Sequence, residues 1–202
     1  MVVLLAVGSL AGAYLLGAVP FSYLVTRAAS GHDLRRVGTG TVSGSGVGEA
    51  SGFWPMAAAG LLDIGKGIAA ALPFAGSRPW LAALMAGAAI IGHNWSVFLG
   101  GAGGRGVSVA GGACLVLAGE GVVVLGLGLA LGRLVSYTAT GSFISFLVLP
   151  VALGISRGGG GVLLGLALVA PMLVKRVVGN TSPSSLRPGV LLYRLVRDHD
   201  PE

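Results

Sequence analysis

The pattern of seven apolar segments separated by polar or glycine-rich stretches constrains this chain more than any other feature. A helix needs about 20 apolar residues to cross a hydrocarbon core of about 30 Å. The longer segments reach that length, so the pattern predicts a helical protein that crosses a membrane repeatedly. The first segment lacks the basic start of a signal peptide, and we interpret it as a retained span. The segments are Val2–Val25, Phe53–Phe74, Trp80–Phe98, Val107–Leu117, Val122–Leu131, Tyr137–Ile155 and Gly161–Val174.

The composition excludes most soluble classes of protein. Hydrophobic residues make up 54% of the chain and charged residues only 10%, whereas soluble domains carry about 25% charged residues. The same balance excludes intrinsic disorder. The net charge is +6, but the cations lie between apolar segments, so they are topological signals and we expect no nucleic-acid partner. With the single Cys114 and no Cys/His spacing typical of zinc, we expect no metal and no cofactor.

The fourth and fifth segments could be two short helices or one long helix, Val107–Leu131. The chain has 13 Lys and Arg residues, of which Lys66 lies inside the second segment. With two helices and an outside N-terminus, ten of the other twelve lie inside and two outside, whereas with one helix five lie inside and seven outside. The positive-inside rule favours two helices, and Ala118–Gly121 supplies a turn. We therefore predict an all-α integral membrane protein with seven transmembrane helices, of which the fourth and fifth are short. Residues 1–202 form one membrane domain, with the N-terminus outside and a cytoplasmic tail over about 175–202.

Three polar elements fall on the cytoplasmic side in this topology, where they can build one site at the membrane surface. They are the loop Arg27–Ser51, the loop Gly92–Gly112 and the tail from Lys175. The second loop carries Gly103, Gly104, Arg105 and Gly106 directly before an apolar helix. Free N–H groups at a helix start, glycines and an arginine fork are typical of a phosphate site. The plainer interpretation is a flexible turn with a basic anchor.

The first polar loop offers hydroxyl groups and exposed backbone N–H groups that could form an anion nest. Polar Gly/Ser/Thr loops are also common as flexible linkers. We expect substrate contacts from Gly38, Thr39, Gly40, Thr41, Ser43 and Ser45.

Two further groups of polar residues lie within or beside the apolar segments. Asp63 and Lys66 are three residues apart and share a helix face, either as part of a site wall or as a buried ion pair. His93 lies at the cytoplasmic end of the third segment. It could contact substrate or act as a base, or it could simply lie at the interface beside Trp95.

These elements, in this order, make the chain resemble the bacterial acyl-phosphate:glycerol-3-phosphate acyltransferases, the PlsY family. The resemblance covers nearly the whole chain and rests on YLLGAVPFSYLVTR with GHDLRRVGTG, on LLDIGKGIAAALPF and on GHNWSVFLGGAGGRGVSVAGG. It implies an inner-membrane enzyme that moves an acyl chain from acyl phosphate to glycerol 3-phosphate, forming lysophosphatidic acid. The implied partners are these two substrates and membrane lipids. The oligomeric state is not readable from the sequence.

The resemblance also assigns roles, and the chain departs from the family pattern at several positions. The family's GSGNxGATNxxR loop here has Thr39 for Ser, Thr41 and Gly46 for the two Asn, and Glu49 for Arg. GGKG becomes Gly103–Gly106 with Arg105 as its cation. The third element keeps Arg176 and Asn180 but has Val177 for His, and the Gly-Thr-Glu ending is absent. The catalytic residues implied are Arg105, Thr39 and Asn180, with Lys66, His93 and Arg176 among the substrate contacts.

The departures leave three interpretations of activity. The chain is an active but divergent acyltransferase, an enzyme with another acceptor, or a catalytically silent paralogue that binds lipid or a membrane partner. A transporter would need a polar path across the membrane, and only Asp63 and Lys66 are clearly charged within a segment. We expect the acyltransferase. In its mechanism, a phosphate leaving group needs its charge stabilised more than it needs a protein nucleophile, so the acceptor hydroxyl could attack directly.

Overall fold

The computed structural model describes residues 2–181 and 183–201, and the regular elements of that part of the chain are helices. Three of them are short 3₁₀ turns: η1 (Leu34–Arg36), η2 (Leu72–Phe74) and η3 (Val97–Leu99). The α-helices are α1 (Val2–Ala18), α2 (Phe21–Ser30), α3 (Gly44–Ser51), α4 (Phe53–Ala71), α5 (Pro79–Asn94), α6 (Val107–Leu117), α7 (Gly119–Leu134), α8 (Thr138–Val178) and α9 (Pro188–Arg197).

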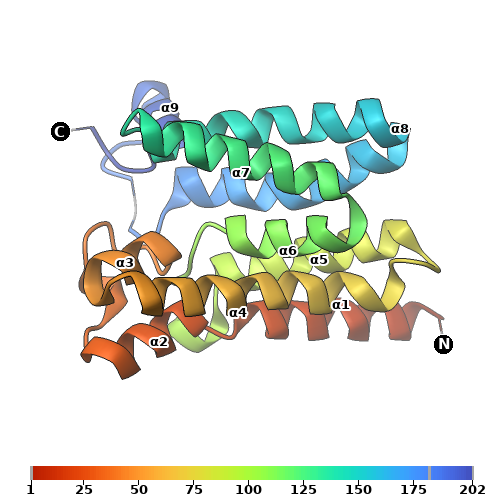
Figure 1. Cartoon of the computed structure of the whole chain (residues 1–202), viewed down its shortest axis with the longest axis horizontal. Helices are drawn as coiled ribbons and strands as arrows, with labels where there is room; N and C mark the ends of the chain where they lie inside the picture. The colour runs from red at the N-terminus through yellow and green to blue at the C-terminus, as the bar shows by residue number, and fades with distance from the viewer. Residues whose placement is uncertain (1, 182, 202) are drawn as a thin grey trace.

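The long helices lie side by side along one axis of the molecule (Figure 1). α1, α4, α5 and α6 form one part of the bundle, while α7 and α8 form the other. Gly158 has non-helical angles, φ 63° and ψ −148°, which divide α8 into two arms. The second arm runs back beside the first, so the C-terminus lies at the opposite end of the bundle from the N-terminus (Figure 1).

Small residues allow the helices to approach closely. A Cβ on Gly67 of α4 would collide with the Val109 carbonyl of α6, and one on Gly112 of α6 would collide with the Ile64 carbonyl of α4. Apolar burial gives little net drive between helices in lipid, so close packing of this kind carries the association. Gly67 and Gly112 therefore allow the close packing of α4 against α6.

Among the described residues, four helical stretches are long and apolar enough to cross a membrane: Ala6–Ser30, Phe53–Phe74, Pro79–Leu99 and Thr138–Val178. The last contains both arms of α8. The choice between one long helix and two short ones is answered at Ala118, whose φ of −164° ends α6 and precedes α7. At 11 residues, α6 rises only about 16 Å, so it is too short to span the bilayer alone. The count of seven spans and the orientation of the termini stay predictions.

Three stretches differ in local structure from what the sequence suggested. The first apolar segment is divided between α1 and α2, because Pro20 has no N–H to continue the helix. The first polar loop, expected to be irregular, contains the eight-residue α3. Lys175 and Arg176, assigned to the tail, lie in the last turns of α8 and are buried.

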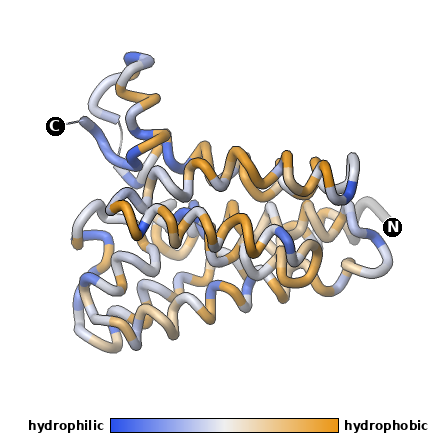
Figure 2. The backbone as a smooth tube through the Cα atoms, turned by 45° about the horizontal axis from the view of Figure 1, so that its top comes forward, coloured by the Kyte–Doolittle hydropathy of each residue, from blue (hydrophilic) through white to orange (hydrophobic). Residues whose placement is uncertain are grey.

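Hydrophobic residues follow the long helices over most of their length (Figure 2). Hydrophilic residues gather most densely at the end of the bundle that carries the C-terminus (Figure 2). That end also holds α2, α3, α9 and the start of α6 (Figure 1). The fold thus brings the three polar elements of the sequence together at one end of an apolar bundle.

Candidate functional site

A cavity of about 890 Å³ opens at this polar end of the bundle. Its wall combines the first polar loop, α3, the start of α6, the end of α7 and the start of α8 with residues near the C-terminus. The polar and charged residues that line it are Thr39, Thr41, Ser43, Ser45, Glu49, Asp63, His93, Arg105, Ser108, Arg133, Thr138, Ser142, Arg176 and Asp198. Phe53, Met56, Val107 and Leu129 supply an apolar part of the same wall.

The glycine-rich segment before α6 is held against the end of α5. The Gly104 N–H donates to the His93 carbonyl at 3.0 Å. Gly106 has φ 77°, in the left-handed region, and a Cβ there would lie 2.7 Å from Ile90 Cγ2. Only glycine fits both conditions without strain. The backbone is therefore fixed where Arg105 leaves it, directly before the N-terminus of α6.

Asn180 ties this segment to the first polar loop. Its Oδ1 accepts from the Gly103 N–H at 3.1 Å, and its Nδ2 donates at 2.9 Å to the carbonyls of both Gly103 and Gly40. The Val42 N–H also donates to the Gly103 carbonyl, at 3.1 Å. Asn180 thus acts on the site by joining two loops, and both N–H donors of its amide are used in doing so.

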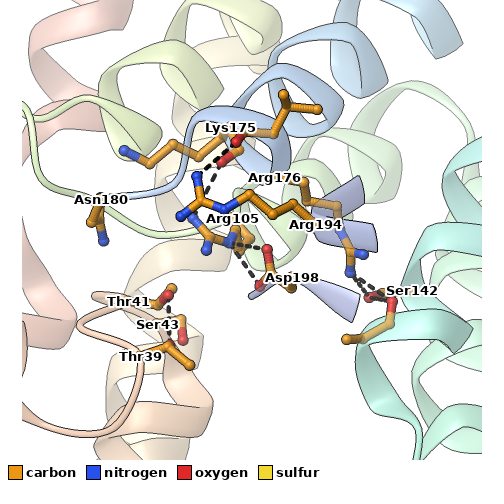
Figure 3. A network of polar contacts seen from close by, with 12 residues as sticks. Thr39, Thr41, Ser43, Arg105, Ser142, Lys175, Arg176, Asn180, Arg194 and Asp198 are labelled. Atoms are coloured by element: carbon orange, nitrogen blue, oxygen red, sulfur yellow. Dashed lines mark hydrogen bonds and ion pairs between the residues drawn. The ribbon is translucent and has the colours of Figure 1, made fainter. Parts of the chain in front are cut away.

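Arg105 lies between Lys175 and Asp198 (Figure 3). Its Nε is 2.8 Å from Asp198 Oδ2 and 2.7 Å from Oδ1, and its Nη1 has a long contact of 3.5 Å to the Lys175 carbonyl. The Arg105 side chain is 11% exposed and that of Asp198 is 21% exposed. This ion pair is therefore shielded from most solvent screening, yet both residues still line the cavity.

Hydroxyl groups of the first polar loop form the opposite part of the wall. Thr39 donates to Thr41 at 2.9 Å (Figure 3). The Ser43 and Ser45 hydroxyls are 3.0 Å apart. Ser43 directly precedes α3, and Ser43, Gly44 and Ser45 at the start of that helix line the cavity. Glu49, on the same helix, also lines the cavity and brings a negative charge.

Arg176 lines the cavity, but most of its donors are already used. Nη1 donates to the carbonyls of Leu195 and Val196 in α9, at 2.8 and 3.2 Å. Nη2 donates to the Ala139 carbonyl and to the Ser142 hydroxyl, at 2.6 and 2.7 Å. The side chain therefore holds α9 against the start of α8.

A buried polar cluster lies beneath the cavity. Asp63 pairs with Lys66 at 2.8 Å, accepts from the Ser22 hydroxyl at 3.1 Å and lies 3.6 Å from His93 Nδ1. Lys66 also donates to the Gly17 carbonyl, at 3.2 Å. Asp63 and His93 reach the cavity wall, whereas Lys66 does not. The ion pair expected from the sequence is present, and its carboxylate reaches the cavity wall directly, beside His93.

The structure gathers most of the residues that the sequence singled out, with clear exceptions. Gly103 and Gly104 are buried and donate their N–H groups to Asn180 and His93, so in this structure those groups support the loop. Of the candidate residues, those lining the cavity are Thr39, Thr41, Ser43, Ser45, His93, Arg105, Gly106 and Arg176, while Gly38, Gly40, Lys66, Gly103, Gly104 and Asn180 do not line it.

Sequence reasoning missed Arg133, Ser108 and Asp198 as cavity residues. Arg133 was counted only as a topological signal. Ser108 directly follows the glycine-rich segment, and its place in the first turn of the helix could have revealed it. No signal in the sequence marked Asp198, because its contact with Arg105 depends on how the last helix folds back.

Comparison with known proteins gives a consistent result. Residues 7–182 match the family model described as glycerol-3-phosphate acyltransferase. A glycerol-3-phosphate acyltransferase of Synechococcus sp. (strain CC9902) is 34% identical over 185 residues, which cover 86% of this chain and 92% of that protein. One of Thermus thermophilus is 38% identical over 157 residues, covering 74% of this chain and 77% of the relative.

Two solved structures share the fold. The crystal structure of PlsY, an integral membrane glycerol 3-phosphate acyltransferase, in its glycerol 3-phosphate form has a TM-score of 0.77. It is 24% identical and covers 85% of this chain, with 88% of its own chain matched. The lysophosphatidic acid form has a TM-score of 0.69 and 20% identity, covering 93% of this chain and 98% of its own.

Proposed function

Because the chain belongs to the glycerol-3-phosphate acyltransferase family, we propose that it transfers an acyl chain from an acyl phosphate to glycerol 3-phosphate. The products are lysophosphatidic acid and inorganic phosphate. The enzyme is a multi-pass membrane protein, and we place it in the bacterial inner membrane with the cavity on the cytoplasmic side. Membrane lipids and the two substrates are its partners in this proposal.

The observation that carries the proposal is the convergence of Arg105 and two helix N-termini on one cavity. Gly106, directly before α6, and Ser108, in its first turn, line the cavity beside Arg105, and Ser43 and Ser45 line it at the start of α3. Helix N-termini offer free N–H groups and partial positive charge, and an arginine adds a fork of donors. Such a site suits phosphate groups, which both substrates carry.

The cavity also has a place for an acyl chain. Phe53 and Met56 of α4 and Leu129 of α7 line it, and α6, which lies between these two helices, is short. We propose that the acyl chain leaves the cavity between α4 and α7 toward lipid. A donor bound in this way places its hydrocarbon against apolar residues and its phosphate near Arg105.

In the proposed reaction, a hydroxyl oxygen of glycerol 3-phosphate attacks the acyl carbonyl carbon. A C–O ester bond forms, and the bond between the acyl carbon and the phosphate oxygen breaks. The hydroxyl proton passes to the acceptor's own phosphate group, so no protein nucleophile is needed. Arg105 and the nearby helix N-termini stabilise charge on the departing phosphate, where electrostatic stabilisation has its largest effect. Thr39 and Thr41 form the opposite wall.

The test is inorganic phosphate release by the purified protein in a lipid phase with palmitoyl phosphate, with and without glycerol 3-phosphate. We expect release that depends on glycerol 3-phosphate, together with formation of palmitoyl lysophosphatidic acid. Release without the acceptor would instead indicate hydrolysis or another acceptor. No release from folded protein would favour a silent paralogue that binds lipid.

The matched control is Arg105→Ala in the same assay. We expect a loss of activity of about a hundredfold or more, the size seen when a preorganised charge-stabilising donor is removed. Full activity in folded Arg105→Ala protein would remove Arg105 from the proposed mechanism.

A further inference from the structure

Asp198 approaches Arg105 from outside the part of the chain that the family model covers. The model match ends at residue 182, and Asp198 caps the end of α9 with φ 68°, a left-handed conformation. Buried arginines hold α9 in place. Arg176 donates to the carbonyls of Leu195 and Val196, while Arg194 donates to those of Val177 and Val178. The position of Asp198 is therefore fixed independently of its contact with Arg105.

The contact uses one particular edge of the guanidinium group. Both Asp198 oxygens lie within 2.8 Å of Arg105 Nε. Nη1 has only the 3.5 Å contact to the Lys175 carbonyl, and Nη2 has no acceptor among the described residues. The end of the guanidinium that carries Nη1 and Nη2 is thus available to bind a phosphate with two parallel hydrogen bonds.

We propose that Asp198 is a positioning residue for the acyltransferase reaction, holding Arg105 by Nε so that Nη1 and Nη2 face the phosphate group of the acyl phosphate. This assignment rests on the proposed function. A lysine at position 105 would present a single ammonium group, without a separate Nε that Asp198 could bind while other N–H groups bind the phosphate. The need for Asp198 is therefore tied to arginine at this position.

Because Asp198 is negatively charged, a positioning role can be distinguished by kinetics from a role in which it only blocks anion binding. A carboxylate beside Arg105 weakens ground-state binding of any anion by Coulomb repulsion. If Asp198 served only to block the site, its removal would lower the KM for acyl phosphate and leave or raise kcat. A positioning residue predicts the reverse for kcat, because a loosened Arg105 no longer stabilises the departing phosphate in the transition state.

The test is a double-mutant cycle of wild type, Asp198→Asn, Arg105→Lys and the double variant, with kcat and the KM for palmitoyl phosphate measured for each. Asparagine is chosen because it tolerates the left-handed conformation and keeps the shape of the side chain. We expect Asp198→Asn to lower kcat about tenfold, the size of a lost charge-assisted hydrogen bond, without raising KM. In the Arg105→Lys background the same change should lower kcat by no more than about twofold.

Asp200→Asn is the matched control on the same segment. Asp200 pairs with Arg194 Nε at 2.7 Å but does not line the cavity. We expect this variant to lower the thermal midpoint and to leave kcat within about twofold of wild type. An equal loss of kcat in Asp200→Asn would show that docking of α9, and not the hold on Arg105, is what matters.

The remaining outcomes are decisive as well. A higher kcat in Asp198→Asn, or equal losses in the arginine and lysine backgrounds, would overturn the assignment while leaving the proposed function intact. A wild-type protein without turnover that depends on glycerol 3-phosphate would overturn the proposed function, and the assignment with it.

Discussion

The Asn180 side chain bonds both backbone polar groups of Gly103, accepting from its N–H at 3.1 Å and donating to its carbonyl at 2.9 Å. The two residues are 77 positions apart in the chain. The same Nδ2 reaches the Gly40 carbonyl, so one side chain joins all three polar elements of the sequence. The shape of the cavity therefore depends on a residue that does not line it.

Replacing Asn180 with alanine should impair both stability and activity. Three hydrogen bonds are lost, each with a net value of about 1 kcal/mol, and the Gly103 and Gly40 groups lose a partner. We expect a lower thermal midpoint and a fall in kcat of about tenfold or more as the Arg105 loop loosens. Phosphate release and thermal unfolding of the purified variant measure the two effects. Unchanged kcat in a destabilised Asn180→Ala protein would contradict the link between loop and site.

The sequence alone predicts the local structure of this protein better than its long-range contacts, for a physical reason. Helix positions and the break before α7 follow from local patterns, namely apolar runs and a turn of small residues, so they were predictable. The roles of Asn180 and Asp198 depend on contacts between segments 77 and 93 residues apart. No local pattern encodes such contacts. α3 was missed because Gly and Ser are weak helix formers, and here packing outweighs propensity.

The predicted topology indicated which polar elements would meet, but motif chemistry gave only a partial account of what each residue does. Gly103 and Gly104 were assigned to phosphate on the basis of motif chemistry, whereas their N–H groups donate to Asn180 and His93. A motif specifies which residue types are present, and only the fold decides which of their polar groups remain available.

Lys66→Met should destabilise the protein strongly. The side chains of Lys66 and Asp63 are 1% and 3% exposed, so the single change leaves a carboxylate buried without its main partner. Breaking a buried pair in this way costs about 3–5 kcal/mol. The double variant Asp63→Asn with Lys66→Met removes both charges and should recover part of that loss. Thermal unfolding in detergent measures the relative stability of the two variants. A double variant less stable than Lys66→Met would contradict the prediction.

Glu49→Gln should lower the KM for glycerol 3-phosphate. Glu49 lines the cavity and repels anionic substrates, and the change removes that charge while keeping the size of the side chain. We expect a KM about two- to tenfold lower at low ionic strength, with the effect shrinking as salt screens it. Steady-state kinetics at two salt concentrations measures this. A higher KM would instead mean that Glu49 contacts the acceptor directly.

Arg133→Gln should raise the KM for the anionic substrates several-fold. Arg133 lies near the end of α7, lines the cavity and makes no ion pair within residues 2–181 and 183–201. Its charge is therefore available to attract phosphate groups, in contrast to the charge of Arg105, which Asp198 partly neutralises. The matched control is Arg78→Gln, because Arg78 is exposed just before α5, at the other end of the bundle (Figure 1). If both variants raise KM equally, the effect comes from the overall charge of the protein and does not depend on the location of Arg133 in the cavity.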